Sequence, residues 1–315
     1  MRVSVILPAY NAARFLSEAI ESVLRQTVSD FELLAIYEHS HDSTLRVLEA
    51  YAKHDSRIRI IHSPEPGLPA ALNAGLLCAR SELVARLDAD DRMLPTRLER
   101  QLWFLEHHPD MSVICSYGYF INASGRRIGK AGNSVDAARG RRETDPLLFV
   151  QIIHPSVIVK RRDVLAVNGY RNYPFCEDRD LWGRLITGGF QIACQEECLV
   201  EFRVHGNSKS VREYAGNINA CRWIDHNIIR RLQGQAEMPY DEYLQWFKHQ
   251  SLRKRLRERS LRRSQAELHV ASRYYADRRW FRCAMHVALA MALHPRRVIA
   301  TLATKVVLRF PVIAE

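Results

Sequence analysis

The sequence predicts an α/β protein whose mostly parallel central sheet is flanked by helices and followed by a helical C-terminal region. Short apolar runs alternate with amphipathic stretches through the first hundred residues, and this order indicates parallel strands joined by helices. Beyond about residue 213, apolar residues recur at helical spacing and arginines become frequent. We therefore expect an α/β domain over residues 1–212 and a basic helical accessory region over residues 213–315.

The individual elements follow from apolar runs and helical spacing, taken in order along the chain. We expect strands at residues 3–7, 31–37, 58–61, 83–87, 113–121, 157–159 and 199–204. We expect helices at residues 12–25, 43–53, 68–79, 95–107 and 178–187. Pro8 ends the first strand, and Pro95 suits the first turn of a helix, where a missing N–H costs nothing. The polar segment 122–144, with its glycines and arginines, predicts a long loop.

Composition limits the class of protein. The chain has 315 residues, of which 47% are hydrophobic and 26% charged, as in globular rather than disordered proteins. Its seven cysteines form no CxxC pair, which argues against a zinc module or a disulfide framework and favours a reducing compartment. A strand begins almost at Met1, leaving no room for a signal peptide, and no apolar run reaches the ~18 residues of a membrane span. We expect a cytoplasmic protein.

The net charge of +11 is concentrated near the C-terminus. Residues 253–282 hold eleven Lys and Arg against three acids, a net charge of +8. Such a segment attracts an anionic membrane surface or a nucleic acid, or it is simply a solvated helix face. We do not expect nucleic acid as a partner, because the chain shows no recognisable binding module and its acids at 88–91 repel phosphate unless a metal intervenes.

Three carboxylates, Asp88, Asp90 and Asp91, follow the predicted strand 83–87 directly. Open α/β sheets bind ligands beyond the carboxyl ends of their strands. Carboxylates packed this closely repel one another unless a cation neutralises them, and hard oxygen ligands suit Mg²⁺ or Mn²⁺, which usually bring substrate phosphates. A solvated acidic loop is the alternative interpretation of these three residues alone.

Several short motifs in a fixed order carry a resemblance to a known family. They are VSVILPAYN at 3–11, DST at 42–44, GLPAALN at 67–73, RLDADD at 86–91, HPS at 154–156, EDRDLW at 177–182 and FRVHGNS at 202–208. With these motifs the chain resembles the family 2 glycosyltransferases, which have the GT-A nucleotide-sugar-binding fold. The match covers about residues 2–210. It implies a GT-A catalytic domain over residues 1–212.

The resemblance implies an activity and a metal. The expected enzyme is a metal-dependent inverting glycosyltransferase that moves a sugar from a nucleoside diphosphate, with UDP as first choice, to a hydroxyl of a glycan or lipid-linked acceptor in surface polysaccharide biosynthesis. The transferred group is expected to be a hexosyl or N-acetylhexosaminyl unit. Mn²⁺ or Mg²⁺ would spread the charge of the departing diphosphate. By resemblance, Asp90 is the direct metal ligand, Asp88 binds the ribose or the metal through water, and Asp91 contacts the donor sugar.

The resemblance also assigns the nucleoside site. Pro8 and Tyr10 lie in the turn that holds the nucleoside, where Tyr10 is expected to stack on the base, unless it is an ordinary turn aromatic. Glu38 stands where the family carries an Asp that accepts a hydrogen bond from the base. The sequence departs from the family here, because the usual Asp pair followed by Gly is missing before Asp42. That departure leaves the identity of the nucleotide open.

Two further motifs are expected to act on the acceptor and the diphosphate. Asp178 is the expected base that takes the proton of the acceptor hydroxyl, with Glu177 orienting the acceptor. The alternative is an acidic first turn that only complements the helix dipole. Arg203 and His205, two apart on a predicted strand, share one face. Arg203 is expected to bind phosphate, and His205 to complete the metal shell, although a lone histidine is more often structural.

Some residues in these motifs are expected to be structural. Asp180 does not share the helix face of Asp178. We expect a structural role for His154 and a core position for Trp182. In the C-terminal region an apolar stripe accompanies the arginines; its members are Trp280, Phe281, Ala284, Val287 and Ala288. Such a helix either lies in a membrane interface or packs on the α/β domain. We expect peripheral attachment to the inner face of the plasma membrane.

Two other classes of protein remain as alternatives. A sugar nucleotidyltransferase would usually carry a Gly-rich basic loop after the first strand, and residues 8–11 are not one. A non-catalytic or dual-role nucleotide-sugar-binding protein that docks a membrane partner should have lost its acids, and both acidic clusters are present.

Overall fold

The structure is a computed structural model that describes residues 1–132, 152–173, 176–205, 214–276, 279–295 and 298–299. The chain divides into two compact units. The first unit holds Met1–Tyr119 and Ala131–Phe202, and the second holds Phe120–Lys130 and Arg203–Glu315. The boundary near residue 212 that we expected from the sequence stays a prediction.

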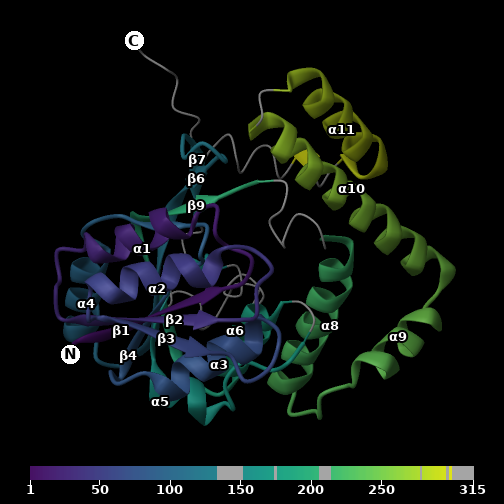
Figure 1. The fold of residues 1–315 in the computed structure, drawn as a ribbon. Coiled ribbons are helices and arrows are strands. Elements are labelled where there is room, and N and C mark those ends of the chain that lie inside the picture. Colours follow the sequence, from purple (N-terminus) through teal and green to yellow (C-terminus); the bar gives the residue numbers. More distant parts are fainter. Residues whose placement is uncertain (133–151, 174–175, 206–213, 277–278, 296–297, 300–315) are drawn as a thin grey trace. The chain divides into compact units, whose positions relative to one another are not determined.

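The first unit begins with the predicted alternation of strands and helices. Its elements are β1 (Val3–Ala9), α1 (Leu16–Leu24), β2 (Phe31–Tyr37), α2 (Thr44–His54), β3 (Ile58–His62), α3 (Leu68–Cys78) and β4 (Leu83–Arg86). These strands pair in parallel in the order β3-β2-β1-β4. Figure 1 shows α1 and α2 on one side of the strands and α3 on the other. Helices on both faces explain why β2 is buried along its whole length.

The order of these strands creates a switch point between β1 and β4. The chain moves outward from β1 to β2 and β3, then returns past β1 to form β4. The helices that leave β1 and β3 therefore lie on opposite faces of the sheet, because parallel crossovers are right-handed. Open α/β sheets bind ligands at such a switch point, beyond the carboxyl ends of the strands, which here are β1 and β4.

Antiparallel strands complete the sheet. Beyond β4 the order continues β8 (Ile158–Lys160), β6 (Met111–Ile121), β9 (Gln191–Arg203) and β5 (Arg92–Met93). The β4–β8, β6–β8 and β5–β9 pairs are antiparallel. The remaining helices here are α4 (Arg97–His107), α5 (Arg161–Ala166) and α6 (Glu177–Thr187). The parallel pattern expected from the sequence thus holds for four strands.

Several segments differ from the sequence-based expectation. Strand β1 continues through Pro8 to Ala9, and β5 and α5 were not expected. Strand β9 begins at Gln191, earlier than the expected 199. Its first half was not predicted because it is only partly buried and shows no continuous apolar run. Part of the expected 122–144 loop forms β7 (Arg127–Ala131), which pairs with β6. The Asn122 carboxamide closes the intervening turn by accepting hydrogen bonds from the Ser124 and Arg126 N–H groups. Residues 133–144 of the expected loop lie outside the described residues.

The second unit is helical beyond residue 213, as expected. It contains α8 (Tyr214–Leu232), α9 (Tyr240–Lys248), α10 (Leu252–Ala276) and α11 (Trp280–Leu293). Helices α10 and α11 lie side by side as an antiparallel pair (Figure 1). The Ser264 hydroxyl donates to the Ala290 carbonyl at 2.9 Å, and the Ser260 hydroxyl donates to the Leu293 carbonyl. Among the described helices, none has the length and hydropathy needed to cross a membrane.

Candidate functional site

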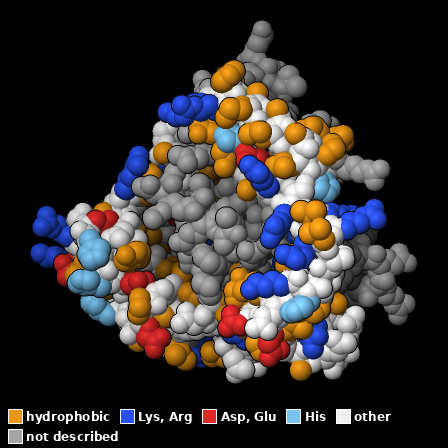
Figure 2. Space-filling model, turned by 90° about the vertical axis from the view of Figure 1, so that its right-hand side faces the viewer, with side chains coloured by type: hydrophobic (Ala, Val, Ile, Leu, Met, Phe, Trp, Pro, Cys, Tyr) orange, Lys and Arg blue, Asp and Glu red, His pale blue; other side chains and the backbone are white. Residues whose placement is uncertain are grey.

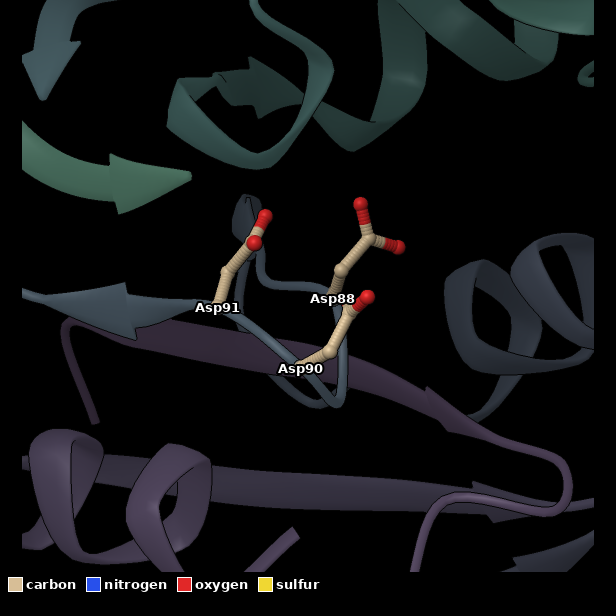
Figure 3. Close-up of side chains that lie close together, drawn as sticks. All are labelled: Asp88, Asp90 and Asp91. Carbon is tan, nitrogen blue, oxygen red and sulfur yellow. The ribbon is translucent and has the colours of Figure 1, made fainter. Parts of the chain in front are cut away.

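Three carboxylates form a compact group just after β4, at the switch point. Ligand oxygens of Asp88, Asp90 and Asp91 all lie within 4.8 Å of one another. A turn brings them together, with the Asp91 N–H donating to the Asp88 carbonyl at 3.1 Å. Figure 3 shows the three side chains projecting from the β4–β5 connection into the same space. Oxygen ligands at this spacing suit a hard divalent cation, which would relieve their mutual repulsion.

Arg86, the last residue of β4, balances part of this negative charge. Its buried guanidinium forms a two-pronged ion pair with Asp88, with Nη1 donating to Oδ2 at 2.6 Å and Nη2 donating to Oδ1. Burial raises the pKa of Asp88, the Asp90 and Asp178 carboxylates raise it further, and Arg86 opposes the rise. The positive charge of one arginine therefore acts on several carboxylates. The negative charge that remains unbalanced suits these carboxylates to bind an added cation.

Asp178 joins this group from a distant part of the sequence. It lies in the first turn of α6, after Glu177, and its Oδ1 accepts a hydrogen bond from the Arg179 N–H at 2.7 Å. Burial raises the pKa of Asp178, and Arg86 lowers it. Because Asp178 in turn raises the pKa of Asp88, the two carboxylates are close enough to interact. The two acidic motifs identified in the sequence thus meet within the first unit.

Asp180, two residues further along α6, has a different environment. Its buried carboxylate accepts a hydrogen bond from the buried Arg184 Nε at 2.7 Å, one helical turn away. Arg184 also donates to the Gly169 carbonyl at 2.7 Å. The ion pair lies within α6, and the hydrogen bond from Arg184 to Gly169 ties this helix to the segment before it, so both are structural contacts.

A buried histidine–tyrosine pair lies beside the acids. His154 Nε2 and the Tyr170 hydroxyl are 2.9 Å apart. Burial lowers the pKa of His154 well below its ordinary value, and Arg86 lowers it further. Burial also raises the pKa of Tyr170, while Asp178, Glu177 and Asp88 add to that rise. Both side chains are therefore uncharged at neutral pH and add no charge near the acids.

Asn73 on α3 holds Tyr170 in place. Its carboxamide donates to the Tyr170 carbonyl at 2.7 Å and accepts from the Tyr170 N–H at 2.8 Å. Gly169 is needed here, because its φ is 60° and a Cβ would approach the Asn73 Oδ1 to 2.6 Å. Tyr170 could not be predicted from the sequence, because a lone tyrosine carries no spacing signal and its partners come from distant segments.

Helix α4 fixes the segment that carries His154. Arg97 Nη2 donates to the Val157 carbonyl at 3.0 Å, and Gln101 Nε2 donates to the Ser156 carbonyl at 2.8 Å. Burial and a neighbouring arginine lower the pKa of Arg97 to about 9. These buried contacts stabilise the wall of the site and support a structural role for the segment.

The residues predicted to bind the nucleoside lie on the other side of the switch point. Pro8 is within β1, opposite Ile36, and Tyr10 follows β1 with 52% of its surface exposed. Glu38 follows β2, and its Oε2 accepts a hydrogen bond from the Gly67 N–H at 3.0 Å, at the start of α3. The exposed Tyr10 ring is available for stacking, whereas the Glu38 carboxylate already has a backbone partner.

The loops after β1 and β2 are bound to each other. The Asn11 N–H donates to the Ser40 hydroxyl at 3.1 Å, and Asn11 Oδ1 accepts from the His41 N–H at 2.8 Å. Asp42 Oδ2 accepts from the Ala13 N–H at 3.0 Å. Side-chain contacts therefore organise this end of the sheet, although the segment lacks the glycine usual in the family.

Arg203 and His205 belong to the second unit, so their expected roles at the site stay predictions. Arg203 is buried, and its Nη1 donates to the Asn122 and Ala123 carbonyls at 3.3 and 3.2 Å. His205 is partly buried. The remainder of their motif, 206–208, lies outside the described residues.

Solved structures share the fold of this chain. TarS of S. aureus, solved in complex with UDP, superposes with a TM-score of 0.57 over 93% of this chain and 91% of TarS, at 15% identity. The mannosyltransferase PcManGT of Pyrobaculum calidifontis, solved with GDP-Man and Mn²⁺, has a TM-score of 0.56 over 98% of this chain and 80% of its own, at 17% identity. These similarities confirm the predicted GT-A fold.

Sequence comparison identifies the family. A glycosyltransferase of Haemophilus influenzae with no assigned role is 32% identical over 72% of this chain and 73% of its own length. The O-antigen biosynthesis glycosyltransferase WbnJ of Escherichia coli is 29% identical over 65% of this chain and 81% of its own. The family model "Glycosyl transferase family 2" matches residues 4–164, which include the acidic triad. The chain therefore belongs to glycosyl transferase family 2.

Proposed function

We propose that this glycosyltransferase is metal-dependent and inverting, and that it transfers a hexosyl or N-acetylhexosaminyl unit from a nucleoside diphosphate to a hydroxyl of a glycan or lipid-linked acceptor. One observation carries the proposal. Within the first unit, the Asp178 carboxylate at the start of α6 is near enough to the acids after β4 to raise the pKa of Asp88. A group of carboxylates suited to a cation and a candidate base thus interact at the switch point of the sheet.

The acids after β4 are the proposed donor site. Asp90 is the proposed direct metal ligand, Asp88 binds the ribose or reaches the metal through water, and Asp91 contacts the donor sugar. When bound, Mn²⁺ or Mg²⁺ supplies positive charge to the departing diphosphate. The ion pair with Arg86 favours a water-mediated role for Asp88, because both of its oxygens already accept hydrogen bonds.

The nucleotide is proposed to be UDP. TarS has been solved with UDP and with UDP-GlcNAc, whereas PcManGT has been solved with GDP-Man. Tyr10 would stack on the base, and Glu38 would accept a hydrogen bond from it after giving up or sharing the Gly67 N–H. Arg203 and His205 are proposed to contact the diphosphate and the metal.

Asp178 is the proposed general base. In an inverting transfer the base removes the proton of the acceptor hydroxyl as its oxygen attacks the anomeric carbon. A carboxylate with a raised pKa takes that proton more readily than an ordinary aspartate, so the burial of Asp178 supports this role. Glu177 would orient the acceptor. Asp180 is committed to Arg184 and takes no part.

The proposed biological setting is the assembly of a surface polysaccharide. WbnJ is described as an O-antigen biosynthesis enzyme, and another relative, 32% identical over 42% of this chain, is the chondroitin synthase of Escherichia coli. An acceptor carried on a membrane lipid fits the basic C-terminal region, with the enzyme attached peripherally at the inner face of the plasma membrane.

Thermal unfolding with a panel of nucleoside diphosphates, each with and without Mn²⁺, tests the donor site. We expect one nucleotide to raise the melting temperature only when metal is present, and Asp90→Ala to abolish the shift. Release of the nucleotide from its sugar in the presence of acceptor then tests transfer. Metal-dependent binding without any transfer would instead favour a non-catalytic nucleotide-sugar-binding protein.

A further inference from the structure

Helix α11 is apolar on two opposite sides. Its inner side packs on α10 through Ala290 and His286, whose Nδ1 contacts Glu267 Oε2 at 2.5 Å. Its outer side carries Phe281, Met285 and Leu289, one helical turn apart, which are 86%, 45% and 45% exposed. A helix that is apolar all round is normally buried on all sides. The outer side of α11 therefore lacks a partner among the described residues of the second unit.

We call this outer side the α11 stripe. It consists of Trp280, Phe281, Ala284, Met285, Ala288, Leu289 and Ala292, all of them exposed. Figure 2 shows hydrophobic side chains gathered in the upper part of the view, where the α10–α11 pair lies. A contiguous apolar surface of this kind marks an interaction site, unlike apolar side chains scattered singly.

Arginines flank one end of the α11 stripe. Arg279 and Arg282 are exposed, and together with Trp280 and Phe281 they line a shallow hollow. Contacts with α10 fix this end, because the Arg282 guanidinium lies 5.6 Å from the centre of the Tyr274 ring. Helix α11 contains no acidic residue, and the basic segment 253–282 leads directly into it.

We propose that the α11 stripe inserts into the interface of an anionic lipid bilayer, with Arg279 and Arg282 against the lipid phosphates. Aromatic and aliphatic side chains next to arginines are the composition of a helix that lies in the plane of a membrane. The charge is complementary to anionic lipid. A second copy of the chain fits less well, because a twofold contact through the α11 stripe would bring two basic segments together.

The proposal extends the proposed function by naming the surface that reaches a membrane-borne acceptor, but its test requires no catalysis. Full-length protein is sedimented with vesicles of phosphatidylcholine alone or mixed with phosphatidylglycerol. We expect binding to the mixed vesicles that weakens as salt is raised. Phe281→Ser should weaken binding by roughly 10- to 150-fold, since burying a phenylalanine contributes about 1.5–3 kcal/mol. Substituting all three of Phe281, Met285 and Leu289 by serine should abolish it.

Control variants test whether vesicle binding depends on the α11 stripe itself or on any exposed aromatic or charged side chain. Trp103→Ser changes a 56% exposed tryptophan on α4 of the first unit and should leave vesicle binding unchanged. The double variant Arg279→Gln, Arg282→Gln should weaken binding to anionic vesicles by at least tenfold, at about fivefold per arginine. The double variant Arg25→Gln, Arg162→Gln removes the same charge from exposed sites of the first unit and should have a much smaller effect.

Three results would overturn the proposal. Full-length protein that stays in the supernatant with anionic vesicles at low salt would exclude membrane binding. Stripe variants that bind as the wild type does would place the contact elsewhere. A dimer in analytical ultracentrifugation that Phe281→Ser dissociates, without vesicle binding by the wild type, would make a second copy the occupant. A retained nucleotide-induced melting shift in each variant would show that the donor site is intact.

Discussion

The acidic site of the first unit and the α10–α11 pair of the second unit use charge in opposite ways. In the first unit, buried arginines pair with carboxylates that are partly or fully buried, as in the pairs of Arg86 with Asp88 and Arg184 with Asp180. In the second unit, Arg279 and Arg282 are exposed beside an apolar surface. A buried charge has lost its hydration, so removing its partner destabilises the fold, whereas an exposed charge stays hydrated without a partner. Substitutions should therefore have large effects in the first unit and small ones in the second.

The largest expected effect is on catalysis. Asp178→Asn should slow sugar transfer by about a thousandfold, because a general base contributes roughly 10²–10⁴-fold. Initial rates of nucleotide release with acceptor measure the loss, and the nucleotide-induced melting shift checks that donor binding survives. A rate within tenfold of the wild type would remove Asp178 from the role of base.

The next effect is on stability. Asp180→Asn should lower the free energy of unfolding by about 3 kcal/mol, because it removes the buried carboxylate that pairs with the buried Arg184 guanidinium. Chemical denaturation measures the change. The exposed Asp110→Asn is the matched control and should change stability by less than about 0.5 kcal/mol. Equal effects of the two substitutions would contradict the distinction between buried and exposed charge.

Asn73→Ala should have a smaller effect, about 2 kcal/mol, because it leaves the N–H and carbonyl of Tyr170 without their side-chain partner. Tyr170 should then move relative to His154, so transfer should fall by more than donor binding does. Denaturation and initial rates measure the two effects. Full stability together with full activity would show that the Asn73 contacts do not position the site.

The pH dependence of Asp178 offers a further test. Its folded-state pKa is raised by burial, so the stability it contributes is present below its unfolded pKa and is lost as pH rises through the folded pKa. Without nucleotide or metal, Asp178→Asn should therefore be more stable than the wild type at pH 7. The difference should have disappeared below about pH 3, where aspartate is protonated in both states. Denaturation curves at the two pH values measure it; an undiminished difference at pH 3 would refute this account.

The smallest effect is expected at the two arginines that flank the α11 stripe. The double variant Arg279→Gln, Arg282→Gln should change the free energy of unfolding by no more than about 0.5 kcal/mol, because both side chains are exposed. Thermal or chemical denaturation in the absence of lipid measures this. A loss of several kcal/mol would mean that these arginines stabilise the unit itself, and the contrast between the two units would fail.

Much of the fold could be predicted because its signals are local. The runs that form β1 and β2 are apolar over most of their length, and the helices between them show regular apolar spacing. The first half of β9 was missed because only some of its side chains are buried. Strand β7 was missed because its pairing with β6 depends on a turn closed by the Asn122 side chain rather than on apolar residues.

In the candidate site, too, only the features with a local sequence signal could be predicted. The acids at 88–91 and the pair at 177–178 were recognised from local motifs, yet nothing in their spacing requires Asp178 to affect the pKa of Asp88. Tyr170 carries no motif of its own and enters the site only through Asn73 and His154. Contacts of this kind join residues far apart in the chain.

The sequence by itself determined the order of strands and helices, the acidic motifs, the family and the basic character of the C-terminal region. Each depends on residues close together in the chain, where period and composition are sufficient. Tertiary structure alone decided that Arg86 binds Asp88, that Asp178 approaches the acids, and that α11 keeps an apolar side exposed. These outcomes depend on which surfaces meet after the chain has folded, and local periodicity carries no information about that.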